Sequence, residues 1–369
     1  MRRTIPALLA TMRKVLLAAL IATLAIPSLA LADERWCDDG HHWKRVWGAT
    51  AYDTMQAVLV TQDVFPEGGV EHVIIATGDG YWDALSAAGL AGVNDTAILI
   101  TPSDHLGDQA RAELERMRPH YVHIVGGRAA VSDRVEADVK DLLGIPMDSN
   151  IRLAGTRASD TAIAIFRAGD PTKWNAGNDE SYCIVATTNG YWDALSVAPL
   201  AYARHIPIFL ADYDPESGGY ILSDNTLEAM KLGEFDHVII VGGKAAVSDD
   251  VKTQIQQISS ESDPIAVERW SGKTAIDTSA EIATMEVERF HMSIGNMMVA
   301  TSNGYWDALS AAPVAGRLNS VLVLMDQFGN NHQAFDAVFS KDEVGIGYVL
   351  GGQMALSEAV EGYIVVQSK

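Results

Sequence analysis

The sequence predicts an α/β protein made of three parallel-sheet modules in tandem, and three observations support this prediction. The heptapeptide Gly-Tyr-Trp-Asp-Ala-Leu-Ser (GYWDALS) occurs at residues 80–86, 190–196 and 304–310. A short apolar run precedes each copy and an Ala-, Leu- and Val-rich run follows it, which indicates a strand, a glycine turn and a helix. The aspartates of the three copies are 110 and 114 residues apart. A repeat of that length can form a domain, so the chain divides into three.

Each repeat is expected to alternate strands and helices in the same order. It opens with Arg-x-x-Gly and then Asp-Thr, which indicates a strand end, a turn and a helix start. Three apolar strands follow, and the third ends in a glycine pair before a last helix. Their expected positions are 72–77, 97–100 and 122–125, then 183–187, 207–210 and 238–241, then 297–301, 321–324 and 348–350. Continuous apolar strands between helices indicate a parallel sheet covered on both faces.

The expected organisation is a signal peptide at 1–32, an N-terminal segment at 33–44 and modules at 45–147, 148–262 and 263–369. The signal peptide rests on Arg13-Lys14, the apolar residues 15–26 and the small residues that end at Ala32. A membrane anchor is the weaker alternative, because the apolar run is short for a span. No second apolar stretch of spanning length follows, so we expect no membrane insertion after signal removal. Short linkers favour compact packing of the modules.

Charge, cysteine and histidine content narrow the range of functions. Removing residues 1–32 takes away four basic residues and no acidic ones, so the formal charge of −21 becomes −25. Nucleic acid is therefore not an expected partner, because phosphate contacts need clustered Lys and Arg. Cys37 and Cys183 could form a bridge after export, but the apolar run around Cys183 favours a lone buried thiol. Two adjacent histidines, His41 and His42, cannot close a metal site, so a surface segment is favoured.

Four motifs in fixed order resemble the cell-wall-binding repeat type 2 family. In the second repeat they occupy residues 152–162, 192–201, 207–210 and 238–248, and equivalents recur in the other two repeats. The resemblance covers nearly the whole chain after residue 32. It implies a secreted Gram-positive cell-surface protein whose three Rossmann-like or Toprim-like modules form a pseudo-threefold trimer. It also implies non-covalent attachment to an anionic wall polymer.

The sequence departs from the family pattern at several positions. The family often places an Arg three residues after the glycine of the opening motif, where this chain has Ala51, Ala158 and Ala275; Arg157 comes one residue early. Gly89 stands where the other repeats have Pro199 and Pro313, and the last glycine pair is followed by Gln353-Met354. These departures concern polymer affinity or type and leave the predicted fold unchanged.

Candidate binding residues lie where the loops follow the strands, because ligands of open parallel sheets bind beyond the carboxyl ends. The basic candidates are Arg45, Arg152, Arg269, Arg128 and Lys244. An Arg fork matches phosphate or carboxylate, but an ion pair with one of the many acidic residues is equally open. The aromatic candidates are Trp82, Trp192 and Trp306. They could stack on sugars, although aromatic bulk between modules is favoured.

No catalytic set of residues is apparent in the sequence. Asp83, Asp193 and Asp307 could act as acid or base, but we expect them to cap helices. Gly272-Lys273-Thr274 lacks the earlier glycine of a phosphate loop, and Pro215 interrupts a calcium-like acidic run at 212–216. We therefore expect no cofactor, no metal and a non-catalytic anchoring role. A surface-layer or adhesin component in contact with neighbouring surface proteins is the alternative, and a wall hydrolase is less favoured.

Overall fold

The computed structural model describes residues 33–38, 40, 42–144, 150–260 and 264–367. The predicted signal peptide at 1–32, His41 and the middle of both predicted linkers lie outside these residues. All described residues belong to a single structural unit.

The first sheet has the strand order β4-β3-β5-β6, and all its strands are parallel. The strands are β3 (His72–Thr77), β4 (Ile98–Thr101), β5 (Tyr121–Val125) and β6 (Asn150–Leu153). The helices of this repeat are α2 (Ala51–Gln62), the 3₁₀ turn η1 (Ala84–Ser86), α3 (Ala87–Val93), α4 (Asp108–Met117) and α5 (Asp133–Leu143). The predicted alternation of apolar strands with helices is therefore observed.

The second sheet has the order β11-β10-β7-β8-β9, in which only β9 is antiparallel to its neighbour. The strands are β7 (Tyr182–Thr187), β8 (Ile208–Asp214), β9 (Gly219–Ile221), β10 (His237–Val241) and β11 (Ala266–Trp270). The helices are α6 (Ala158–Ala168), α7 (Trp192–Ala203), α8 (Asp224–Leu232) and α9 (Asp250–Ile258). The β8–β9 hairpin was not predicted from the sequence.

The third sheet has the order β1-β2-β14-β12-β13, with β1 antiparallel to β2. The strands are β1 (Asp33–Trp36), β2 (Trp43–Trp47), β12 (Ser293–Thr301), β13 (Ser320–Met325) and β14 (Gly347–Leu350). The helices are α10 (Ala275–Phe290), α11 (Trp306–Arg317), the 3₁₀ turn η3 (His332–Phe335), α12 (Asp336–Phe339) and α13 (Glu358–Gln367).

The strand that opens each repeat completes the sheet of another repeat. β6 pairs with β5, so Arg152 lies beside Ile124, and β11 pairs with β10. β2, near the start of the chain, pairs with β14, near its end. The sequence repeat and the hydrogen-bonded sheet are therefore offset by one strand, and β2 closes the series of three sheets into a ring.

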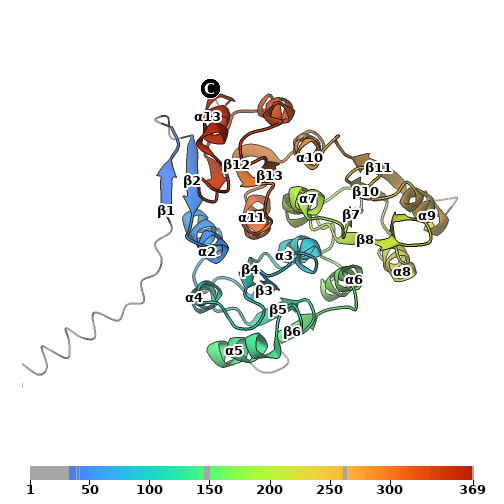
Figure 1. Ribbon diagram of the computed structural model, residues 1–369. Coiled ribbons are helices and arrows are strands. Elements are labelled where there is room, and N and C mark those ends of the chain that lie inside the picture. The colour runs from blue at the N-terminus through green and yellow to red at the C-terminus, as the bar shows by residue number, and fades with distance from the viewer. Residues whose placement is uncertain (1–32, 39, 41, 145–149, 261–263, 368–369) are drawn as a thin grey trace, which may run out of the picture. The chain divides into compact units, whose positions relative to one another are not determined.

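Helices α3, α7 and α11 pack against one another at the centre of the three sheets (Figure 1). Their inward side chains are fully buried, including Leu90, Leu200 and Val314. A Cβ atom on Gly92 would lie less than 3 Å from the carbonyl oxygen of Tyr202, so α3 approaches α7 more closely than a side chain would allow. The modules thus share one continuous core.

Three tyrosines, one from each GYWDALS loop, mark the axis that relates the modules. The ring centroids of Tyr81 and Tyr191 are 5.2 Å apart, those of Tyr81 and Tyr305 are 5.3 Å apart, and those of Tyr191 and Tyr305 are 5.6 Å apart. Nearly equal distances between equivalent residues indicate a pseudo-threefold arrangement. The predicted fold class, three parallel-sheet α/β modules around such an axis, is confirmed.

Candidate functional site

The GYWDALS loop and the glycine pair of each module meet at the carboxyl ends of the strands. The first glycine of each pair has a positive φ of 102° at Gly126, 102° at Gly242 and 86° at Gly351. A Cβ atom there would come within 3 Å of a carboxylate oxygen from Asp83, Asp193 or Asp307, respectively. Both the backbone conformation and this contact require glycine. Each aspartate therefore links the two loops of its module.

The prediction that these aspartates cap helices is wrong. None of them accepts a capping hydrogen bond, because α7 and α11 begin at the preceding Trp and the carboxylate turns toward the glycine pair. Burial raises the pKa of Asp193 to about 6 and that of Asp307 to about 6. Desolvation of a carboxylate disfavours its charged form, so these two groups are partly protonated in mildly acidic solution.

The arginines of the opening motifs are engaged within the fold. Arg152 donates to the carbonyl oxygens of Gly126 (2.9 Å) and Val131 (2.9 Å), at the two ends of the loop that contains the glycine pair. Its other terminal nitrogen pairs with Glu136 at 2.9 Å.

The other two opening arginines repeat this geometry on their own sheets. Arg269 donates to the carbonyl oxygen of Gly242 at 2.7 Å and lies 3.4 Å from Asp249. Arg45 is 1 % exposed; it donates to the Gly351 and Leu356 carbonyls and pairs with Glu361. All three guanidinium groups thus hold a Gly-Gly loop in place, because the strand exchange puts each of them beside the third strand of that sheet.

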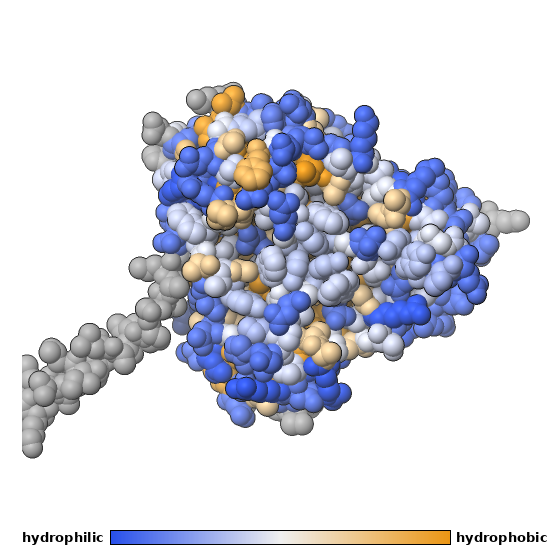
Figure 2. All heavy atoms as spheres, in the orientation of Figure 1, coloured by the Kyte–Doolittle hydropathy of each residue, from blue (hydrophilic) through white to orange (hydrophobic). Residues whose placement is uncertain are grey.

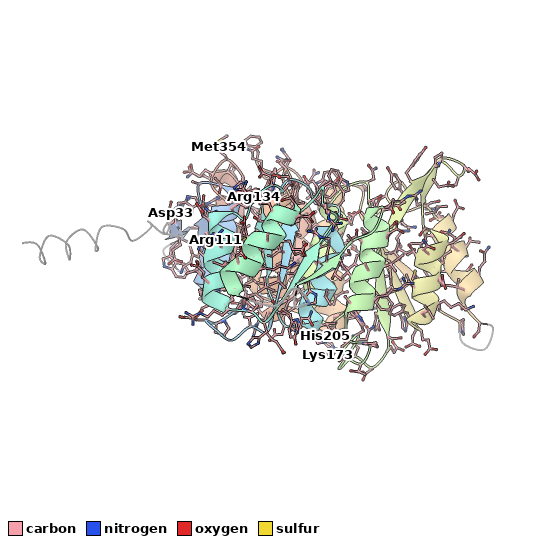
Figure 3. The ribbon with its side chains drawn as sticks, turned by 90° about the horizontal axis from the view of Figure 1, so that it is seen from below. Asp33, Arg111, Arg134, Lys173, His205 and Met354 are labelled. Carbon is pink, nitrogen blue, oxygen red and sulfur yellow. The ribbon has the colours of Figure 1, made fainter. Side chains whose placement is uncertain are left out.

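Arg128 and Lys244, which directly follow glycine pairs, lie on the surface. Their side chains are 73 % and 76 % exposed, and each has an acidic neighbour, Asp133 at 2.7 Å and Asp249 at 2.5 Å. Exposed pairs of this kind contribute little to stability, which leaves both cations accessible to a ligand. Figure 3 places Met354, from the third Gly-Gly loop, and Lys173 and His205 on opposite sides of the molecule. Arg128 and Lys244 follow the equivalent glycine pairs of the other two modules, so the pseudo-threefold symmetry puts them on the same side as Met354, here called the loop side.

The three tryptophans differ in their contacts. The indole N–H of Trp192 donates to the Ser302 carbonyl at 2.7 Å, and that of Trp306 donates to the Gly78 carbonyl at 2.7 Å. Both bonds cross from one module to the next. Trp82 makes no such bond to any described residue of another module, and it is 50 % exposed.

A pocket of about 440 Å³ lies beside Trp82, between the first and second modules. The first module contributes residues of both its loops, including Gly127, and the second module contributes Arg157 at the start of α6, Thr188 after β7 and Asp212 on β8. Arg157 stands 3.7 Å from Asp212, which also accepts a hydrogen bond from Ser159. From the sequence, Arg157 was noted only as an Arg that lies one residue before its usual position in the family. The acidic run that contains Asp212 was rejected as a calcium site, because Pro215 interrupts it.

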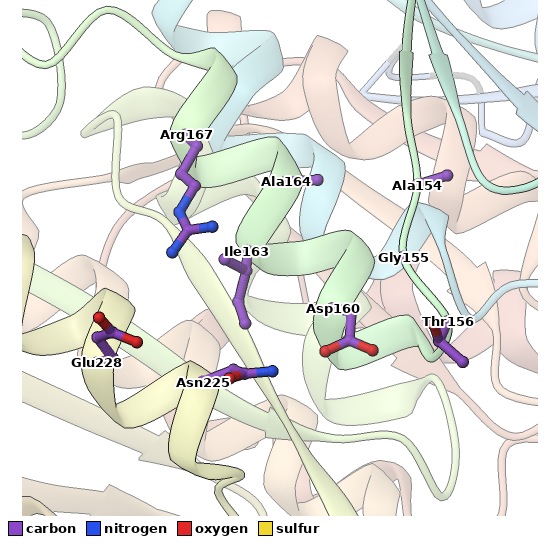
Figure 4. A pocket seen from close by; sticks show the side chains of 9 residues that line it. All are labelled: Ala154, Gly155, Thr156, Asp160, Ile163, Ala164, Arg167, Asn225 and Glu228. Atoms are coloured by element: carbon purple, nitrogen blue, oxygen red, sulfur yellow. The ribbon is translucent and has the colours of Figure 1, made fainter.

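A second hollow, of about 520 Å³, lies on the outer side of the second module between α6 and α8. Figure 4 shows Arg167, Glu228, Asn225 and Asp160 around it, with Ile163 between them. It does not adjoin the Gly-Gly loop, so it is separate from the repeated loop pair.

The described residues show neither a metal-ligand cluster nor a membrane-spanning helix. No group of three or more His, Cys, Asp or Glu side chains there could hold a metal ion. None of the helices in the same residues is both long and apolar enough to cross a membrane.

Cys37 and Cys183 are free thiols. Cys183 is fully buried and Cys37 is partly buried. Figure 2 shows a mainly hydrophilic face with only small apolar patches.

Each of the three modules presents the same pair of loops, and the three pairs surround one axis. The chain is therefore a tandem-repeat α/β protein and differs from a domain that has a single site. The family model "Cell wall binding domain 2 (CWB2)" matches three segments, residues 45–136, 152–252 and 269–361. These segments cover most of the sequence, so the chain belongs to this family of cell wall binding domains, as its motifs predicted.

Two curated relatives match most of this chain. The chain is 26 % identical over 311 residues to the N-acetylmuramoyl-L-alanine amidase LytC of Bacillus subtilis, and the match covers 84 % of this chain and 54 % of the relative. It is 26 % identical over 321 residues to the amidase enhancer of the same organism, covering 86 % and 39 %. The chain thus spans about half the length of these relatives or less.

Two solved structures share the fold. Cwp6 from Clostridium difficile superposes with a TM-score of 0.69 at 22 % identity, covering 84 % of this chain and 45 % of that one. Cwp8 from the same organism superposes with a TM-score of 0.70 at 23 % identity, covering 87 % and 50 %.

Proposed function

We propose that this chain is an exported, non-catalytic protein that attaches non-covalently to an anionic secondary polymer of the cell wall through its three modules. The observation that carries the proposal is the threefold presentation of one loop pair by a chain of the cell wall binding family. Several weak contacts repeated along a linear polymer raise avidity by orders of magnitude without any single strong contact. The sequence repeats at 45–147, 148–262 and 263–369 are the proposed binding units.

The exposed cations of the loop side are the proposed contacts with the polymer. The whole chain has a formal charge of −21, so an anionic polymer must meet a local positive group. Arg128 and Lys244 provide such groups at equivalent positions, while the third module has Gln353 there. Arg152 and Arg269 act as positioning residues, because they hold the loops that carry Arg128 and Lys244.

The relatives' amidase names belong to proteins of which this chain matches about half or less. Asp193 and Asp307, the repeated carboxyl groups with a pKa of about 6, are packed against glycine pairs. That position favours a structural role over proton transfer to a substrate. A surface-layer or adhesin component remains the alternative, in which the same loops contact neighbouring surface proteins.

Sedimentation with purified wall sacculi tests the proposal. We expect the chain to bind intact sacculi, to bind less after chemical removal of the secondary polymers, and to lose affinity as salt screens the charges over about 10 Å at 0.1 M. The double substitution Arg128→Ala and Lys244→Ala should weaken binding by about tenfold or more, because two of the repeated contacts are lost.

The matched control is Lys173→Ala with Lys231→Ala, which changes the net charge equally. Lys173 lies on the opposite side of the molecule, and Lys231 is near the end of α8, next to the start of β10. Equal loss in both double variants would mean that net charge alone controls binding. Release of reducing ends or amino groups from sacculi by the chain would favour the hydrolase.

A further inference from the structure

The pseudo-threefold symmetry is broken at one of the three junctions between modules. At the junction of the second and third modules, the Tyr191 hydroxyl (3.0 Å) and the Trp192 indole N–H (2.7 Å) both donate to the Ser302 carbonyl. At the junction of the third and first modules, Tyr305 (2.9 Å) and Trp306 (2.7 Å) donate to the Gly78 carbonyl in the same way. Two junctions are therefore closed by the same pair of hydrogen bonds.

At the junction of the first and second modules this pair is absent among the described residues. The equivalent donors are Tyr81 and Trp82, and the equivalent acceptor is the carbonyl of Thr188. Trp82 and Thr188 instead both line the pocket of about 440 Å³. Thr188 is partly exposed, whereas Ser302 and Gly78 are buried. The pocket thus occupies the place where the other two junctions are closed.

The backbone shows a reason for this difference. Trp192 and Trp306 are the first residues of α7 and α11, which run for 12 residues each. In the first module, the corresponding segment forms the 3₁₀ turn η1 from Ala84, and the α-helix α3 starts only at Ala87. Trp82 therefore lies in the turn before the helix, and it is 50 % exposed compared with 38 % for Trp306.

The second module has an arginine at a position where the other two modules have a threonine. Thr50 and Thr274 cap α2 and α10 through their hydroxyls, but the residue at the start of α6 is Arg157. Its side chain reaches out to within 3.7 Å of Asp212, which lies near the end of the extended strand β8. A guanidinium donor and a carboxylate acceptor therefore line the same pocket as the exposed indole.

We propose that this pocket binds one pyranose ring of a wall glycan. A sugar ring has an apolar C–H face, which suits a large exposed indole, and a rim of hydroxyl groups. Asp212 and the Thr188 carbonyl accept hydrogen bonds from hydroxyls, and the guanidinium of Arg157 donates to ring substituents. A small polar set around an aromatic wall, in a pocket of several hundred Å³, is the usual composition of a small-ligand site.

This inference rests on the proposed wall-binding function and refines it. Two components of binding are separated in space: exposed cations on the Gly-Gly loops for the anionic groups, and a single stacking site at one junction for the sugar. Salt screens mainly the first component, because a neutral sugar ring has no net charge to be screened, even where its hydrogen-bond partners are Arg157 and Asp212. Binding that persists in 1 M salt should therefore depend on Trp82.

The test compares Trp82→Ala and Trp82→Phe with wild type by sedimentation with sacculi at 0.05 M and 1 M NaCl. We expect wild type to keep a salt-resistant component, Trp82→Ala to lose that component by tenfold or more, and Trp82→Phe to retain an intermediate amount. Trp306→Phe is the matched control, because it removes an indole at a closed junction, and it should leave the salt-resistant binding within about twofold of wild type. Circular dichroism checks that each variant is folded.

The outcomes separate this inference from the proposed function. No binding of wild type to sacculi at either salt concentration would reject the proposed function. Binding at low salt without any salt-resistant component, or a Trp82→Ala variant that binds like wild type in 1 M salt, would reject the pyranose site alone. Removing the secondary polymers from the sacculi identifies the source of the sugar. If the salt-resistant binding survives this treatment, the bound sugar is part of the peptidoglycan strand. If the binding is lost, the sugar is part of the secondary polymer.

Discussion

Glu286, on α10, is a fully buried carboxyl group that has no charged partner among the described residues. Neither of its oxygens makes a hydrogen bond of normal geometry, and burial raises its pKa well above the usual range, opposed only by a weak interaction with the backbone of Leu200. In the unfolded chain the group ionises near pH 4.3. Between that pH and its folded-state pKa, the folded protein binds more protons, so its stability decreases as the pH rises.

Replacing Glu286 by Gln should therefore raise the free energy of unfolding by about 1–3 kcal/mol at pH 8, and by much less at pH 4. Urea denaturation at both pH values measures the difference. The matched control is Glu113→Gln, since Glu113 is equally buried but pairs with Arg116 at 2.6 Å. That change should destabilise the protein at pH 8. A Glu286→Gln variant that is less stable than wild type at pH 8 would show that the carboxylate has a partner in solution.

The opening arginines show why residue roles were harder to predict than residue positions. The sequence placed Arg45, Arg152 and Arg269 at equivalent positions, and an Arg fork matches a phosphate as well as it matches backbone carbonyls. Whether each Arg binds a ligand or backbone carbonyls depends on which strand lies beside it. Because the opening strands pair with the sheets of other repeats, the nearest acceptors are the Gly-Gly loop carbonyls. A local sequence pattern does not reveal which strands pair with one another, so this role of the arginines could not be predicted from it.

At the level of elements, the apolar runs predicted the main parallel strands, because a strand buried on both faces must be apolar throughout. β1 and β9 were missed, since both are short strands at sheet edges and neither contains a buried apolar run. Strand β9 nevertheless matters for the site. The β8–β9 hairpin extends the strand that carries Asp212 into the pocket beside Trp82.

The contact between α3 and α7 depends on the absence of a side chain at Gly92. A Cβ atom there would overlap the carbonyl of Tyr202, and backbone cannot move aside as a flexible side chain can. Gly92→Ala should therefore lower the free energy of unfolding by about 1–3 kcal/mol, although Ala favours helix formation. The control is Gly362→Ala in α13, where a Cβ atom meets nothing within 4 Å. That change should be neutral or slightly stabilising, and an equally neutral Gly92→Ala variant would mean that α3 and α7 separate at little cost.

For the whole molecule, the pairing of β2 with β14 joins the first described strands to the last sheet. Arg45 on β2 and Arg35 on β1 both pair with Glu361 on α13, so side chains reinforce the backbone ladder. A ring of three sheets closed in this way should unfold as one unit, because opening any junction exposes a core that all three modules share. Fluorescence and circular dichroism should therefore report a single coincident transition in urea.

Deleting residues 33–47 should open the ring in a defined place. Without β2, strand β14 becomes an unpaired edge, and Glu361 loses its ion pairs with Arg35 and Arg45. We therefore expect amide hydrogen exchange at Gly347–Leu350 to become at least tenfold faster than in the chain that begins at Asp33. Deleting only residues 33–42 is the control, because it removes β1 and leaves β2 and Arg45 in place, and exchange in β14 should then change little. A synthetic peptide of residues 33–47 should restore protection by adding back the missing strand. Unchanged exchange in β14 after the longer deletion would show that the third sheet is stable alone and that the ring contributes nothing to it.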